Sequence, residues 1–526
     1  MKTKFYNGKF YIGEGQFAHS ILIEDGRIIG IDVDDEGDSK VDLEGATVIP
    51  GLNDSHLHLV QMGQAMNRVD LSVAKNVDEV INMSKDFMES HPKDFFYGRG
   101  WNQDYFENGE VRLLDRHDLD KVSKDVPIML ERVCGHVAAV NTRAIEFMEL
   151  NADTVVEGGE IRLGSDGLPN GIITENALAY VKEFIPKETE DELKKMVIEG
   201  MDYAVSMGVT SVGSTDFYAD GYESTVPLVN GIYKNAEHSL RYDPQFNFQS
   251  MKGLEDYYKT YYLDDSLYND TYTRGTLKVF KDGSLGARTA MLRKPYNDEA
   301  NAMGTSAVDN QVLEEMLAFC EKNSMRMIVH VIGDQAVEDL INIYSKGMAK
   351  GNPNRHGIVH CQITDSGQLK RIAENKIYVY YQPVFLQYDI MIIEDRVGKD
   401  LAKTSYAFKT MQDLDPTLVS YGTDSPVEDL NPFENIYHAV TRQRRNGFPE
   451  GGFYPEERVS VSKAIDAYTI GSAYAQDLDK VKGRIKVGHF ADFVVLDKDI
   501  FTCKPEEIKE IRPIATYISG KKVFSK

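Results

Sequence analysis

Two histidines one residue apart, His56 and His58, close a segment that reads IPGLNDSHLH over residues 49–58. Alternate side chains of a β-strand face the same side, so the two imidazoles would point together. Neutral imidazole is a good ligand for zinc, iron or nickel. The competing interpretation is that both are ordinary loop histidines. Their position at the end of a predicted barrel strand favours a metal-binding role.

Three more residues of metal-ligand type follow later apolar segments. His330, His360 and Asp424 come directly after the segments MIV, GIV and SYGT. A single histidine after an apolar strand is more often a buried structural residue. In a barrel, however, the C-terminal ends of the strands build the active site, so these residues would converge with the H-x-H pair.

The alternation of elements in the middle of the chain predicts the scaffold that would position these residues. Short apolar runs alternate there with segments of helical periodicity. Eight strands are predicted, near residues 48, 209, 241, 277, 327, 358, 378 and 419. This pattern predicts an α/β fold, a (β/α)8 TIM barrel over residues 50–478.

Two regions fall outside the barrel rhythm. Roughly 130 residues separate the first predicted strand from the helix near residue 191, which is more than a plain connection needs. We expect a subdomain inserted after the first barrel strand, at about residues 65–188. The strand-rich ends, residues 1–49 and 479–526, are expected to pair into a small composite β-sandwich domain.

Composition limits the classes of partner. The 526-residue chain has 59 Lys and Arg against 83 Asp and Glu, a formal charge of −24. This acidity argues against binding nucleic acid or an anionic membrane surface. The N-terminus lacks the apolar core of a secretory signal, and the four cysteines are scattered without a C-x-x-C pair. We therefore expect a cytoplasmic protein without a membrane partner.

Seven further motifs occur in a fixed order along nearly the whole chain. They are GRGWNQ (98–103), GHVAAVN (135–141), KVFKDGSLGART (278–289), HVIGDQA (330–336), VHCQ (359–362), GTDSPV (422–427) and GRIKVGHFADFVVLD (483–497). Together with the H-x-H segment, this ordered set resembles the amidohydrolase superfamily of metal-dependent hydrolases. Within it, the chain is most similar to amidohydrolase family 3, which includes N-substituted formamide deformylase-like enzymes.

The resemblance implies a binuclear metal centre with six ligands, and the family's ligand positions are matched by His56, His58, Lys278, His330, His360 and Asp424. The first metal would be bound by the H-x-H pair and Asp424, the second by His330 and His360. Lys278 would bridge both as an N-carboxylated lysine. Zinc is the first expectation, with manganese, iron or nickel as alternatives.

The implied activity is hydrolysis of a C–N bond in an amide, N-formyl or cyclic amide by a metal-activated hydroxide. Asp424 would be the catalytic acid–base. The substrate would be a small amide-like molecule, and related enzymes suggest a homodimer. A deaminase or ester hydrolase using the same site, or a catalytically silent ligand-binding relative, remains an alternative.

Four residues are candidates for contact with the substrate: His136, Arg288, Trp101 and Glu175. Each has a structural alternative. His136 could be an ordinary surface or core histidine, Arg288 could form a structural salt bridge, and Glu175 could be solvated. Trp101, the only tryptophan, could pack within the inserted subdomain.

Overall fold

The computed structural model describes residues 1–107 and 111–526. The chain divides into two compact units. One unit combines residues 1–61 with residues 198–526, and the other comprises residues 62–197. The first unit carries a barrel and a β-sandwich, and the second contains a separate mixed sheet with helices.

The barrel is an eight-stranded sheet in the order β21-β20-β19-β18-β17-β16-β15-β8, and every neighbouring pair is parallel. Its strands are β8 (Leu52–Leu57), β15 (Val209–Tyr218), β16 (Arg241–Asn247), β17 (Thr276–Phe280), β18 (Arg326–Val331), β19 (Gly357–His360), β20 (Tyr378–Tyr381) and β21 (Val419–Tyr421). The segment after β21 returns to β8, where Asp424 N donates to His56 O at 2.8 Å. The predicted TIM barrel is therefore confirmed.

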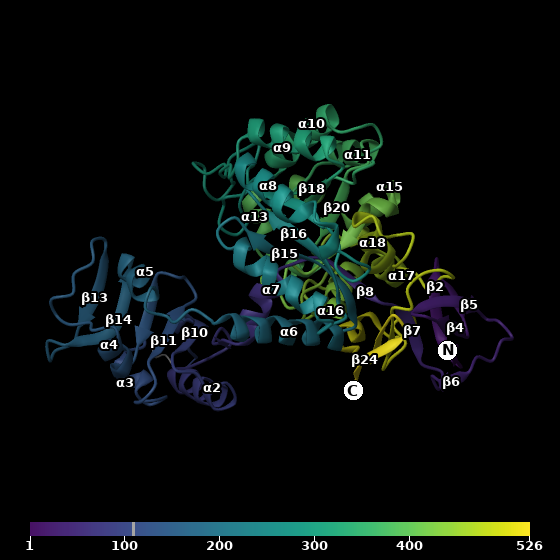
Figure 1. Ribbon diagram of the computed structural model, residues 1–526. Coiled ribbons are helices and arrows are strands. Elements are labelled where there is room, and N and C mark those ends of the chain that lie inside the picture. Colours follow the sequence, from purple (N-terminus) through teal and green to yellow (C-terminus); the bar gives the residue numbers. More distant parts are fainter. Residues whose placement is uncertain (108–110) are drawn as a thin grey trace. The chain divides into compact units, whose positions relative to one another are not determined.

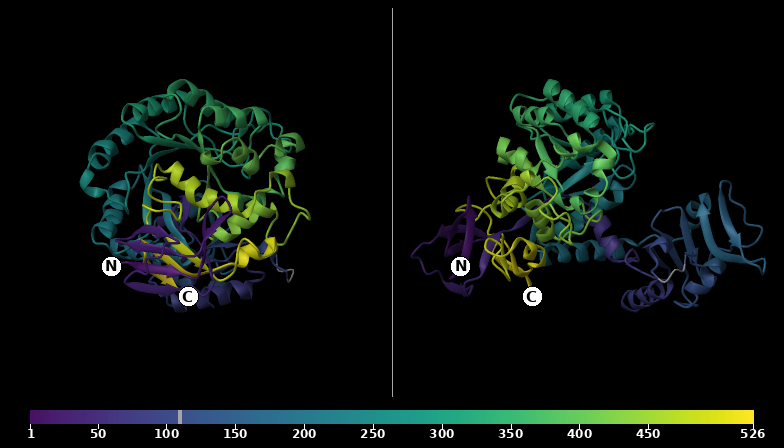
Figure 2. Two further views of the ribbon diagram at one scale, coloured as in Figure 1. Left: turned by 90° about the vertical axis from the view of Figure 1, so that its right-hand side faces the viewer. Right: turned by 180° about the vertical axis from the view of Figure 1, so that it is seen from behind.

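Helices cover the outside of the ring of strands (Figure 1; Figure 2, left). Those following barrel strands include α7 (Tyr222–Lys234), α8 (Met251–Tyr257), α9 (Asn310–Lys322), α10 (Asp334–Gly347), α11 (Ser366–Glu374), α15 (Phe408–Leu414) and α16 (Pro432–Thr441). In α10, the buried positions Val337, Leu340, Ile341 and Tyr344 recur at helical spacing, so one face packs on the barrel. No helix within residues 1–107 and 111–526 is long and apolar enough to cross a membrane.

The β-sandwich is built from both ends of the chain (Figure 2). One sheet has the order β5-β4-β1-β6, and the other has the order β24-β23-β22-β7-β2-β3. Its strands are β1 (Thr3–Tyr6), β2 (Lys9–Gly13), β3 (Gln16–Ala18), β4 (Ile21–Glu24), β5 (Arg27–Ile31), β6 (Ser39–Asp42), β7 (Thr47–Pro50), β22 (Phe493–Leu496), β23 (Pro513–Ile518) and β24 (Lys521–Ser525). Phe5 and Phe493 are among the aromatic residues of its core.

The first barrel strand lies further along the chain than predicted. The strand expected near residue 48 is β7, which pairs with β2 and β22 in the sandwich. The barrel strand β8 begins at Leu52, after the break at Pro50 and Gly51. A Cβ on Gly51 would lie 2.2 Å from Thr210 Oγ1, so the chain needs glycine where it passes from sandwich to barrel. One apolar run therefore serves two sheets.

The unit of residues 62–197 contains a six-stranded sheet in the order β13-β14-β12-β11-β10-β9. Its strands are β9 (Val69–Asp70), β10 (Phe96–Trp101), β11 (Ile128–Arg132), β12 (Val137–Val140), β13 (Gly159–Leu163) and β14 (Pro169–Glu175). Its helices are α2 (Val77–Ser90), α3 (Arg116–Leu119), α4 (Thr142–Phe147) and α5 (Asn176–Lys182). Two separate apolar clusters provide its core.

Candidate metal centre

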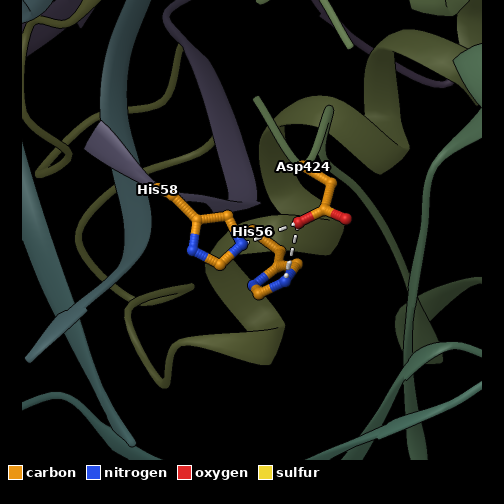
Figure 3. A group of neighbouring side chains, drawn as sticks. All are labelled: His56, His58 and Asp424. Atoms are coloured by element: carbon orange, nitrogen blue, oxygen red, sulfur yellow. Dashed lines mark hydrogen bonds and ion pairs between the residues drawn. The ribbon is translucent and has the colours of Figure 1, made fainter. Parts of the chain in front are cut away.

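His56, His58 and Asp424 converge at the end of the barrel formed by the strand termini (Figure 3). Asp424 Oδ1 lies 3.2 Å from His56 Nε2 and 3.0 Å from His58 Nε2. All three residues are buried. The two histidines alternate with Leu57 at the end of β8, and Asp424 reaches them from the segment after β21 with a left-handed φ of 60°. A non-glycine residue held in this conformation is a feature found at functional sites.

Asp54 stabilises the junction between β8 and the segment after β21, which brings Asp424 to the H-x-H pair. Its buried carboxylate accepts from Thr423 Oγ1 at 2.7 Å and from Thr423 N at 3.1 Å. Burial raises the pKa of Asp54 to about 7. A Cβ on the neighbouring Gly422 would lie 2.7 Å from His56 N, so glycine allows the two backbones to approach. The position of Asp424 is thus set by the packing of β21 against β8.

The other three predicted ligands lie beside this group. Lys278 Nζ is 3.2 Å from His56 Nε2. The ring centroid of His360 is 5.8 Å from that of His56 and 4.4 Å from that of His330. Lys281, the residue that follows β17, points elsewhere and donates to Ser306 Oγ at 2.9 Å. The structure therefore brings all six predicted ligand residues together.

Two glutamines orient two of the imidazoles. His56 Nδ1 lies 2.6 Å from Gln245 Oε1, and His360 Nδ1 lies 2.7 Å from Gln382 Oε1. Each glutamine amide nitrogen donates to a backbone carbonyl at 2.9 Å, which fixes the amide oxygen toward the histidine. An amide oxygen only accepts, so Nδ1 carries the proton in both rings. Nε2 is then left with a lone pair that faces the site.

The remaining two histidines are held in a similar way. His58 Nδ1 lies 3.0 Å from Thr215 O and 2.7 Å from the Tyr218 hydroxyl. His330 uses the opposite ring nitrogen, because its Nε2 lies 3.1 Å from Gly283 O. A hydrogen bond on one ring nitrogen fixes the tautomer and leaves the other nitrogen available to a metal.

The electrostatics of the cluster favour neutral imidazoles. Burial, and next the proximity of Lys278, lowers the pKa of His56 to about 4 and that of His330 to about 3. Burial lowers the pKa of His360 well below its usual value. Burial also lowers the pKa of Lys278 to about 7.

The lone pair of His56 Nε2 faces the Asp424 carboxylate across 3.2 Å. With the His56 proton on Nδ1, no proton lies between these two acceptors. The donor set, imidazole nitrogens beside a buried carboxylate, fits a divalent cation such as zinc.

One supporting residue, Asp282, was not predicted from sequence. It is buried, and it accepts from Gly333 N at 2.8 Å, Met291 N at 2.9 Å and Ile332 N at 3.0 Å. Burial raises the pKa of its carboxyl to about 7. Asp282 therefore secures the segment that follows His330. Its signal in the sequence is the D-G pair that follows Lys278 in the K-x-x-x-D-G motif.

Of the four predicted substrate residues, Arg288 belongs to the same unit as the proposed ligands, and the other three belong to the 62–197 unit. Arg288 forms a two-point ion pair with Asp298, at 2.9 and 3.2 Å, which corresponds to its structural alternative. Trp101 is fully buried in the core of the 62–197 unit and donates to a backbone carbonyl at 2.9 Å. In the same unit, His136 Nδ1 lies 3.1 Å from Glu175 Oε2, and both side chains are exposed.

Comparisons with known proteins agree with this architecture. A family model described as the amidohydrolase family matches residues 40–524. YtcJ of Bacillus subtilis (strain 168), whose name places it among amidohydrolases, is 29% identical over 538 residues, covering 100% of both chains. The N-substituted formamide deformylase of Arthrobacter pascens is 24% identical over 535 residues, covering 96% of this chain and 94% of the relative.

A solved structure is also similar over nearly its whole length. It is an uncharacterized metal-dependent hydrolase from Pyrococcus furiosus, 26% identical, with a TM-score of 0.77. The similarity covers 95% of this chain and 100% of that one. The resemblance inferred from the motif order is confirmed: the chain belongs to the amidohydrolase family.

Proposed function

We propose that this protein hydrolyses a C–N bond of a small amide-type substrate at a binuclear metal centre. The observation that carries the proposal is the convergence of four oriented imidazoles, a buried carboxylate and a buried lysine at one end of the barrel. The name of the Arthrobacter relative, N-substituted formamide deformylase, supports an amide or N-formyl bond as the target.

In this proposal, His56, His58 and Asp424 hold one divalent cation, and His330 and His360 hold a second. Zinc is the first choice because neutral imidazole and carboxylate suit it. The bound cations would act as Lewis acids and lower the pKa of a coordinated water. Asp424 would accept a proton and deliver it to the leaving nitrogen.

Lys278 is proposed to carry an N-carboxylate that bridges the two metals. Only a neutral amine can add to carbon dioxide, and burial lowers the pKa of Lys278 to about 7. About half of such a group is neutral at pH 7, against well under a thousandth of an ordinary lysine. The resulting carbamate would add negative charge where two cations otherwise repel each other.

The proposal is tested with zinc-loaded protein and a panel of N-formyl amines, N-acyl amines, cyclic amides, esters and aminated heterocycles. We expect turnover of at least one amide class, and at least about 100-fold loss of kcat in Asp424→Asn with the fold retained. Glu450→Gln, an exposed acidic position, is the matched control. Turnover of esters or amino-heterocycles alone would overturn the C–N amide assignment, and full activity of Asp424→Asn would overturn its assigned role.

A further inference from the structure

A cavity of about 200 Å³ lies among the segments that follow five of the barrel strands. It is lined by Ser284, Ile332, Gln362, Phe385, Asp389 and Glu428, among others. The cavity borders the metal centre, because the Phe385 ring stacks on His360 with centroids 5.7 Å apart. Gln362, another lining residue, follows His360 by two positions in the sequence. A substrate reacting at the centre could therefore extend into this cavity.

Gln362, which lies in one wall of the cavity, has a buried acceptor without a partner. Gln362 is only 3% exposed, and its Nε2 donates to Asp389 Oδ2 at 2.5 Å and lies against the Tyr406 hydroxyl. Its Oε1 is buried and has no hydrogen-bond partner among the described residues. A buried amide oxygen left unpaired is costly, so it favours a ligand that donates a hydrogen bond.

Two carboxyl groups line the same cavity. Asp389 accepts from the Tyr406 hydroxyl at 2.5 Å, and within residues 1–107 and 111–526 neither Asp389 nor Glu428 has an ion pair. The neighbouring Arg445 is instead paired with Glu434. Burial, and for Glu428 also repulsion from Asp389, raises the pKa of Asp389 to about 6 and that of Glu428 to about 8.

We propose that this cavity binds a cationic group of the substrate, an ammonium or guanidinium, so that the substrate is an amide that also carries a positive charge. This inference rests on the proposed amide hydrolysis and names its substrate class. The cation would supply N–H donors to Gln362 Oε1. It would also favour the ionised forms of Asp389 and Glu428, whose negative charges would then balance its own. The rings of Phe385 and Tyr388, which also line the cavity, would add cation–π attraction.

The test compares monoformylated diamines of three to six methylene groups with neutral N-formyl alkylamines and anionic N-formyl amino acids of matched length. We expect kcat/KM for the cationic series to exceed that for the neutral series by about 10-fold or more, as for hydrogen bonds to charged groups. Glu428→Gln and Asp389→Asn should each remove most of that preference, whereas Glu450→Gln should leave it unchanged. Equal kcat/KM for the three series, or a preference unchanged in both variants, would overturn the inference.

A binding measurement separates this inference from the proposed function. Calorimetry with the free diamines and matched alkylamines reports on the cavity without turnover. Diamine binding that Glu428→Gln weakens, with no N-formyl, N-acyl or cyclic amide of the panel hydrolysed, would reject the proposed function and retain the cation site. Formamide hydrolysis without charge preference would retain the proposed function and reject the cation site. Glu428 accepts no hydrogen bond from the described residues, so its variant should fold even if Asp389→Asn does not.

Discussion

Replacing Gln245 by leucine should weaken metal binding at the H-x-H pair while leaving every proposed ligand in place. The amide oxygen of Gln245 lies 2.6 Å from His56 Nδ1 and accepts from Thr215 Oγ1 at 2.9 Å, and its nitrogen donates to Ser55 O at 2.9 Å. Leucine is of similar size and satisfies none of these groups. Losing such a partner of a ligand histidine typically costs about 10- to 100-fold in metal affinity, or about 1.4–2.7 kcal/mol.

The assay is competition for zinc between the protein and a chelator of known affinity. Gln382→Leu is the matched variant, because it removes the partner of His360 at 2.7 Å. We expect each substitution to weaken one of two zinc equivalents more than the other, while circular dichroism shows a native fold. Unchanged zinc affinity in both folded variants would refute the reasoning that these amides orient the imidazoles.

Three further substitutions test buried contacts of the barrel, two of them beside the proposed site. Gly422→Ala places a Cβ 2.7 Å from His56 N and should lower the free energy of unfolding in urea by about 1–3 kcal/mol. Gly231→Ala is the control, because no atom lies within 4 Å of its Cβ. Equal unfolding free energies of the two variants would contradict the steric argument for Gly422. Asp492→Ala removes the carboxylate that lies 2.6 Å from buried Arg241 and should lower the free energy of unfolding by about 3–5 kcal/mol. A decrease below about 1 kcal/mol would be inconsistent with a buried ion pair. Asp282→Ala leaves three backbone N–H groups unpaired and should lower both thermal stability and zinc content, and wild-type values of both would count against its role.

The barrel could be predicted from sequence because parallel strands buried on both faces appear as short apolar runs. The same rule located His330 and His360, which lie at or near the ends of such runs. It failed at residues 47–52, where the mostly apolar segment TVIPGL is divided between two sheets. The division falls at Pro50 and Gly51, where Thr210, more than a hundred residues away in sequence, leaves no room for a Cβ.

The residues that support the ligands were harder to predict. Nothing in the sequence distinguishes Gln245 and Gln382 from other polar residues in or after strands. Their roles depend on contacts with His56 and His360, which lie 189 and 22 residues away in sequence. The sequence leaves two roles open for Arg288, substrate contact or a structural salt bridge, because nothing in it identifies Asp298 as the partner. Residue type at a strand end thus identifies a candidate ligand, whereas the hydrogen bonds that orient its side chain depend on the folded structure.

The most direct test of the central claim is elemental analysis of protein purified without chelator, reported as metal per chain for the wild type and for Lys278→Ala. We expect about two transition-metal equivalents in the wild type and a clear loss in the variant, because six residues would share two cations. Wild-type protein that contains no metal and fails to take up added zinc or manganese would contradict it.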